Sequence, residues 1–162
     1  MRHHFLFVTL ATLILLPVQR SFAHCEVPCG IYDDQLRFVE MLEDQATIAK
    51  AVAQINELSA KSDAQSKNQL VRWITTKEAH ATNTQQIVAQ YFMTQRIKSD
   101  DMAGPQAYQK KLAAAHTVMV AAMMCKQSAD AAPTAALRAA IYDFYRAYEG
   151  KEPQFDKRRS WR

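Results

Sequence analysis

Apolar residues recur at three- and four-residue spacing along four stretches of the chain, which is the pattern of amphipathic helices. Capping and turn-forming residues separate the stretches, and the connections between them are short. The expected helices span about residues 33–58, 62–98, 105–126 and 133–150. Because short connections place successive helices side by side in opposite directions, the sequence predicts an all-α fold, an antiparallel up-and-down four-helix bundle over residues 33–150.

The apolar positions also indicate which helix faces are buried. Ile74 belongs to the apolar stripe of the second helix, and Met123 to that of the third. Cys125 lies on the third helix, where a lone cysteine usually packs as a small hydrophobe. Four polar residues interrupt the second stripe near its centre, and they either face water or mark a site or a subunit contact: Lys77, His80, Asn83 and Thr84.

The first 23 residues have the pattern of a secretory leader instead. Arg2 precedes an uncharged run over residues 5–17, and the small-x-small sequence Ser21-Phe22-Ala23 follows it. The run is about 13 residues long, whereas a helix that spans a bilayer needs roughly 20. We expect cleavage after Ala23 and no membrane anchor in the mature chain; the alternative is an uncleaved anchor. Export predicts a periplasmic or secreted protein in an oxidising compartment.

Composition and charge narrow the classes of function. Only 3 Gly and 5 Pro occur among 162 residues, which favours helices. Loss of the leader would remove two of the 20 Lys and Arg and none of the 16 Asp and Glu, so the net charge would fall from +4 to +2. Binding of nucleic acid is not expected, because it requires a dense basic stripe. Residues 151–162 are predicted to form a basic C-terminal tail.

Candidate chemistry is concentrated directly after the expected cleavage point. Cleavage would make His24 the N-terminus and place a free amine, an imidazole and the thiols of Cys25 and Cys29 within six residues. Pro28 fixes a backbone angle and Gly30 tolerates a tight turn, so the segment can bring both thiols to one point. The simplest alternative is a Cys25–Cys29 disulfide, which an oxidising compartment would favour.

The types of donor atom select among metals. Two thiolates with a terminal amine and a backbone amide nitrogen favour square-planar Ni(II) or Cu(II) over tetrahedral Zn(II). Two thiolates would reduce Cu(II), so nickel is the better interpretation. Anionic sulfur also stabilises the higher oxidation state of nickel, so such a site could accept one electron and return it.

The sequence His-Cys-x-x-Pro-Cys-Gly-x-Tyr over residues 24–32 resembles the N-terminal nickel hook of nickel-containing superoxide dismutases. The similarity extends more weakly into the helices, through Asp33, Glu40 and the pair Lys77-Glu78. The resemblance therefore implies a hook that binds a nickel ion, carried on the N-terminal end of the bundle.

The resemblance also implies roles for individual side chains. Three residues of the hook would bind the nickel ion: His24, Cys25 and Cys29. Tyr32 would lie over the open face of the ion, where it limits access and orders solvent or peroxide, and Glu40 would orient the hook histidine. The family pairs that carboxylate with an arginine, whereas the aligned residue here is His80, which departs from the pattern.

The activity implied is dismutation, in which two superoxide anions and two protons give O2 and hydrogen peroxide while nickel cycles between Ni(II) and Ni(III). The resemblance further implies a homohexamer. Two alternatives remain open from the residues alone. One is an exported carrier of nickel or copper, and the other is a structural bundle that contains a Cys25–Cys29 disulfide and no metal.

Overall fold

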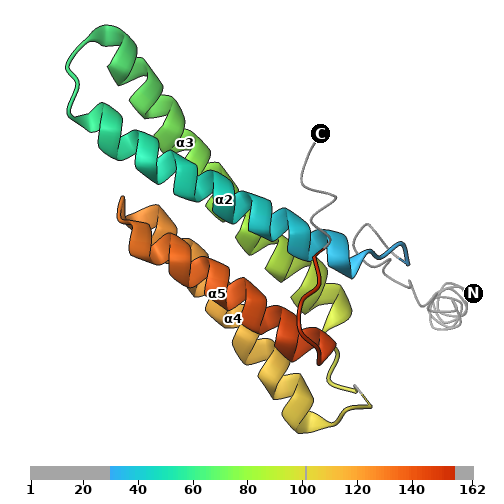
Figure 1. Cartoon of the computed structure of the whole chain (residues 1–162). Helices are drawn as coiled ribbons and strands as arrows, with labels where there is room; N and C mark the ends of the chain where they lie inside the picture. Colours follow the sequence, from blue (N-terminus) through green and yellow to red (C-terminus); the bar gives the residue numbers. More distant parts are fainter. Residues whose placement is uncertain (1–29, 101, 156–162) are drawn as a thin grey trace, which may run out of the picture.

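The computed structural model describes residues 30–100 and 102–155, and every element in this part of the chain is helical (Figure 1). The elements are, in chain order, α2 (Asp34–Ser59), α3 (Ala64–Gln86), the π-helix η1 (Ile87–Arg96), α4 (Pro105–Gln127) and α5 (Ala131–Glu149). Because η1 continues directly from α3, the path consists of four helical rods. The predicted all-α four-helix bundle is confirmed.

Several predictions concern residues outside the described part. They are the cleaved leader over residues 1–23, the hook ligands His24, Cys25 and Cys29, and the end of the tail beyond residue 155. None of the described helices is both long and apolar enough to cross a bilayer.

Capping residues explain where the helices begin and end. The side chain of Asp33 accepts a hydrogen bond from the backbone N–H of Leu36 at 2.9 Å, and Asp63 accepts one from the N–H of Ser66 at 2.9 Å. Each bond satisfies an N–H that the first helical turn leaves unpaired. Gly150 ends α5 at a φ of 70°, a left-handed conformation that glycine adopts without steric cost. The predicted capping roles of Asp33, Asp63 and Gly150 are thus confirmed.

The helices α2 and α3 form an antiparallel pair that extends past the neighbouring ends of α4 and α5 (Figure 1). Lys77 marks the level at which α4 ends. Its buried ammonium group donates hydrogen bonds to the carbonyls of Cys125 at 2.8 Å, Lys126 at 2.6 Å and Ser128 at 3.3 Å. A cation at a helix C-terminus is favoured by the helix dipole. The residues of α3 that precede Lys77 therefore lie on a two-helix projection.

An aromatic cluster fills the other end of the bundle. Phe38, Phe92 and Phe144 are fully buried, and their ring centroids lie 4.9 to 5.2 Å apart. Burial of such a side chain contributes about 1.5–3 kcal/mol to folding. The cluster connects α2, η1 and α5 close to the first described residues, so residues 30–33 adjoin a well-packed end of the bundle.

The predicted burial was wrong at two positions. The Ile74 side chain is 41% exposed, because this part of α3 lies on the projection beyond the end of α4. Met123 is 38% exposed, whereas Val118 is fully buried. The buried face of α4 is therefore rotated slightly from the predicted one.

Two helix boundaries also differ from the prediction. The second rod ends at Arg96 instead of Lys98, and its last ten residues form the π-helix η1. The helix α5 begins at Ala131, so Pro133 lies in its first turn, where the missing N–H costs no hydrogen bond. Of these differences, the π-helix has the larger effect on the candidate site.

Candidate metal centre

Tyr32 lies where the described chain enters the bundle, and its side chain is 36% exposed. Its ring meets the ring of Tyr91 edge to face, with centroids 5.8 Å apart. The guanidinium carbon of Arg96 lies 4.5 Å from the centroid of the Tyr32 ring. The Tyr32 hydroxyl donates to Oε1 of Gln95 at 3.4 Å, which is long for a hydrogen bond between oxygens. Three groups from η1 thus contact the predicted gating tyrosine.

Asp34 holds two of these groups, Arg96 and Tyr91. Arg96 donates from Nε to Oδ1 at 2.9 Å and from Nη2 to Oδ2 at 2.6 Å, a two-pronged contact. The hydroxyl of Tyr91 donates to Oδ1 at 2.6 Å, and that of Tyr148 donates to Oδ2 at 2.8 Å. One carboxylate therefore connects α2, η1 and α5. We call Asp34, Arg96, Tyr91 and Tyr148 the Asp34 cluster.

The cluster has a fixed protonation state near neutral pH. Burial alone would raise the pKa of Asp34, but the hydrogen bonds from Arg96, Tyr91 and Tyr148 lower it below its usual value. Burial and the Asp34 charge raise the pKa of both tyrosines well above their usual range. The hydrogen bonds to Asp34 also raise the pKa of Arg96. Asp34 is therefore ionised, Arg96 is charged and both phenols keep their protons.

The π-helix brings Tyr91 and Arg96 to the same side of the rod. In η1 the backbone N–H groups bond five residues back, as in the bond from the N–H of Ile97 to the carbonyl of Phe92 at 2.8 Å. An α-helix would turn residue i+5 well away from residue i, because it completes a turn in 3.6 residues. The wider turn of η1 places Arg96 on the same side as Tyr91, where both reach Asp34. The sequence of η1 carries no local signal for this widening.

Glu40, predicted to orient the hook histidine, lies on α2. Its Oε2 accepts a hydrogen bond from Nη1 of Arg37 at 2.7 Å. The guanidinium of Arg37 lies 5.1 Å from the centroid of the Tyr91 ring. Tyr32 and Glu40 are therefore connected through Tyr91 and Arg37. Sequence reasoning missed Arg37 and Arg96, because only the fold brings them to the predicted residues.

His80, which aligns with the family's arginine, has a different partner. Its Nδ1 lies 2.7 Å from Oδ1 of the buried Asp44. The other oxygen of Asp44 accepts hydrogen bonds from Asn83 at 2.9 Å and Thr84 at 3.1 Å. Three of the four polar residues at the centre of the second rod thus surround one buried carboxylate, and the fourth, Lys77, binds the end of α4. The arginine paired with Glu40 is Arg37.

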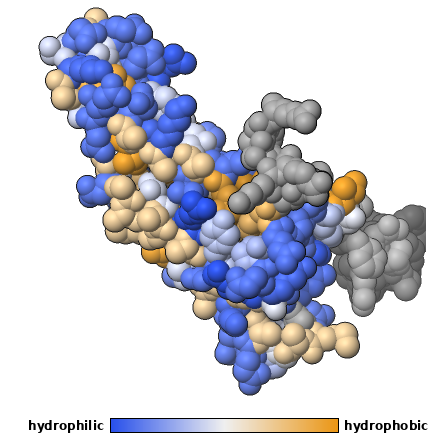
Figure 2. Space-filling view, in the orientation of Figure 1, coloured by the Kyte–Doolittle hydropathy of each residue, from blue (hydrophilic) through white to orange (hydrophobic). Residues whose placement is uncertain are grey.

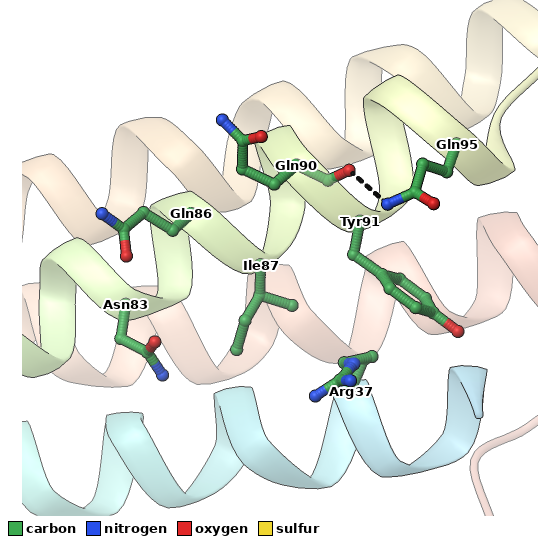
Figure 3. A pocket seen from close by; sticks show the side chains of 7 residues that line it. All are labelled: Arg37, Asn83, Gln86, Ile87, Gln90, Tyr91 and Gln95. Atoms are coloured by element: carbon green, nitrogen blue, oxygen red, sulfur yellow. Dashed lines mark hydrogen bonds between the residues drawn. The ribbon is translucent and has the colours of Figure 1, made fainter. Parts of the chain in front are cut away.

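A surface pocket of about 370 Å³ lies between α2 and the α3–η1 rod. Figure 3 shows Arg37 reaching into it from α2, opposite side chains of the other rod. Most of the residues that line it have polar side chains. A dashed line in Figure 3 marks the bond from Nε2 of Gln95 to the carbonyl of Gln90 at 3.2 Å. The pocket lies beside the Glu40–Arg37 pair and borders Tyr91.

The bundle itself offers little for metal binding. Within residues 30–100 and 102–155, no group of three or more His, Cys, Asp or Glu side chains could hold a metal ion. Burial raises the pKa of the Cys125 thiol to about 11, although the nearby Lys77 ammonium lowers it somewhat. Cys125 therefore stays protonated and is a poor ligand. The donor set predicted for the hook, two thiolates and the amine that cleavage after Ala23 would expose, would fit nickel.

Comparison with known families gives one finding. The family model described as nickel-containing superoxide dismutase matches residues 19–152, a span that includes the hook motif, Tyr32, the Asp34 cluster and Glu40. Neither the curated proteins nor the solved structures contain a match to the chain. The family match covers most of the sequence, and the chain accordingly belongs to the nickel-containing superoxide dismutases, enzymes whose cofactor is a nickel ion.

Proposed function

We propose that the mature chain disproportionates superoxide at a nickel ion bound by the hook, so that two superoxide anions and two protons give O2 and hydrogen peroxide. The ligands would be the amine and imidazole of His24, the backbone amide and thiolate of Cys25, and the thiolate of Cys29. When bound, nickel would supply a Ni(II)/Ni(III) couple stabilised by anionic sulfur. The observation that carries the proposal is the family match, which extends across both the hook motif and its support in the bundle.

The described residues support specific roles in this reaction. Tyr32 borders the hook and keeps a fixed ring orientation through its contacts with Tyr91 and Arg96. In this position the phenol limits access to the reacting centre and orders the solvent around it. Glu40 would orient the His24 imidazole, and Arg37 holds the Glu40 carboxylate at 2.7 Å. The bundle thus contributes positioning groups, while the hook contributes the ligands.

Superoxide is an anion, and the predicted net charge of the mature chain is +2. A positive field raises the rate of encounter with small anions, and salt screens it. We therefore propose that kcat/KM decreases as ionic strength increases. An activity that is independent of salt would argue against electrostatic steering.

Assembly into a homohexamer and export are also proposals. The two-helix projection carries Val71, which is 62% exposed, and Ile74, which is 41% exposed. Figure 2 shows hydrophobic surface between hydrophilic regions on this projecting end. Contact between copies of the chain would cover these side chains. Size-exclusion chromatography with light scattering measures the number of copies, and the intact mass of the exported protein locates the cleavage point.

The decisive experiment compares two nickel-supplemented proteins, one that begins at His24 and one with a single extra alanine before it. The first should consume superoxide and give a rhombic Ni(III) electron paramagnetic resonance signal. The second should do neither, because His24 no longer offers a terminal amine. Equal activity in both would refute the ligand set. Nickel binding without superoxide consumption in the first would favour the metal carrier. Thiol titration of the unfolded, unreduced protein that detects only Cys125 would favour the disulfide-containing bundle.

A further inference from the structure

The contacts of Tyr32 differ in quality. Its hydroxyl bond to Gln95 measures 3.4 Å, beyond the 2.5–3.0 Å usual for O–H···O bonds. Its ring, in contrast, lies 4.5 Å from the guanidinium carbon of Arg96, well inside the range of about 6 Å for cation–π attraction. The orientation of Tyr32 is therefore determined mainly by what its ring touches.

Arg96 is well suited to hold that ring. Two of its nitrogens are fixed by both oxygens of Asp34, at 2.9 and 2.6 Å. Asp34 is itself held by the hydroxyls of Tyr91 and Tyr148, which come from η1 and α5. The planar guanidinium is thus locked in place by contacts that do not involve Tyr32. A preorganised cation loses little conformational freedom when the ring packs on it.

We propose that Arg96 is a positioning residue that holds the Tyr32 ring against the bundle at the hook. Asp34 and the π-helix η1 in turn place Arg96 beside that ring. The proposal builds on the role proposed above for Tyr32. It explains why the rod widens at η1, since an α-helix would turn Arg96 away from Asp34 and Tyr32. It also predicts that the ring of Tyr32, and not its hydroxyl, determines its position.

The test needs no nickel. The mature, nickel-free protein, with its hook thiols reversibly capped by methyl methanethiosulfonate, is treated with tetranitromethane at fixed pH, and nitration of Tyr32 is followed by peptide mass mapping. In Arg96→Gln the rate at Tyr32 should rise about threefold to tenfold, as expected for loss of a partly exposed cation–π contact. Arg96→Lys keeps a cation but loses the two-pronged contact with Asp34, so its Tyr32 nitration rate should lie between those of the wild type and Arg96→Gln.

Two further variants serve as controls. Arg138 lies 5.7 Å from the centroid of the Tyr142 ring on α5, so Arg138→Gln removes a similar contact elsewhere. It should leave the Tyr32 rate unchanged. Asp34→Asn combined with Arg96→Gln avoids an unpaired charge, and it should also accelerate nitration of Tyr32. This double variant decides the question if Arg96→Gln alone does not fold.

An unchanged Tyr32 rate in both the single and the double variant would overturn the proposal. So would an equal rise in Arg138→Gln, which would indicate a general loosening. In the nickel-loaded enzyme, Arg96→Gln should change inhibition by peroxide, and Arg96→Lys should restore part of the wild-type behaviour. If the wild type itself binds no nickel or consumes no superoxide, the proposed function fails, while the nitration result still decides the role of Arg96.

Discussion

Replacing Asp34 by asparagine tests whether the Asp34 cluster stabilises the fold as its geometry indicates. The carboxylate accepts four hydrogen bonds, two from Arg96 and one each from Tyr91 and Tyr148. Asparagine keeps one acceptor oxygen and removes the charge, so about half of these bonds are lost. At about 1.5 kcal/mol for each bond to a charged group, Asp34→Asn should lower the free energy of unfolding by about 3 kcal/mol. The corresponding decrease in Tm is roughly 10 °C.

The pH dependence gives an independent check on the same variant. The pKa of Asp34 is lowered in the folded state, so its contribution is fully present above its unfolded pKa of about 3.9. It disappears as the pH falls through the lower folded value. Wild-type stability should therefore decrease on acidification below about pH 4, and the asparagine variant should lack this component.

The assay is urea unfolding of the nickel-free protein, followed by circular dichroism at pH 7 and at acid pH. Asp143→Asn is the matched control. Asp143 pairs with Arg146 at 2.8 Å but is 70% exposed, so its loss should change stability by less than about 0.5 kcal/mol. The reasoning would be refuted if Asp34→Asn changed the free energy of unfolding as little as the control does and lost stability at acid pH in the same way as the wild type.

Three further changes test other parts of the molecule. Cys29→Ser should abolish superoxide consumption even where some nickel still binds, as measured by metal analysis beside activity. Tyr32→Phe should keep the fold and the nickel, because the ring contacts remain, and should alter the rate or the inhibition by peroxide; an unfolded variant would show that Tyr32 is mainly structural. Lys77→Met leaves three carbonyls at the end of α4 without their donor and should cost about 3 kcal/mol in urea unfolding, whereas a neutral result would contradict its capping role.

The helices and their caps could be predicted from the sequence because their signals are local. Asp33, Asp63 and Gly150 act within one turn of the helix ends that they define, and apolar spacing locates the rods. The hook motif is also contiguous in the sequence, but His24, Cys25 and Cys29 lie outside the described part, so their role as ligands stays a prediction. The buried faces were less predictable. Ile74 is exposed because α4 ends level with Lys77, and the sequence around Ile74 does not indicate where α4 ends.

The support of the site could not be predicted, because its partners are distant along the chain. Asp34 appears in the sequence as a first-turn acid, and only the fold brings Arg96 and Tyr148 to it. The contact of His80 with the buried Asp44 was likewise not predicted, because the two residues lie 36 positions apart. Helix ends were therefore predictable from local signals, and long-range pairing was not.

The burial of Cys125 bears on how long such an enzyme lasts. Peroxide attacks thiolates far faster than thiols, and Cys125 is 1% exposed with a raised pKa. The surface thioethers of Met102, at 104% exposure, and Met124, at 44%, are open to the same product. Peroxide should oxidise these surface methionines first. The resulting methionine sulfoxides can be reduced again by methionine sulfoxide reductases. The interior sulfur should be modified last, so the packing around Lys77 at the end of α4 should survive oxidation of the surface.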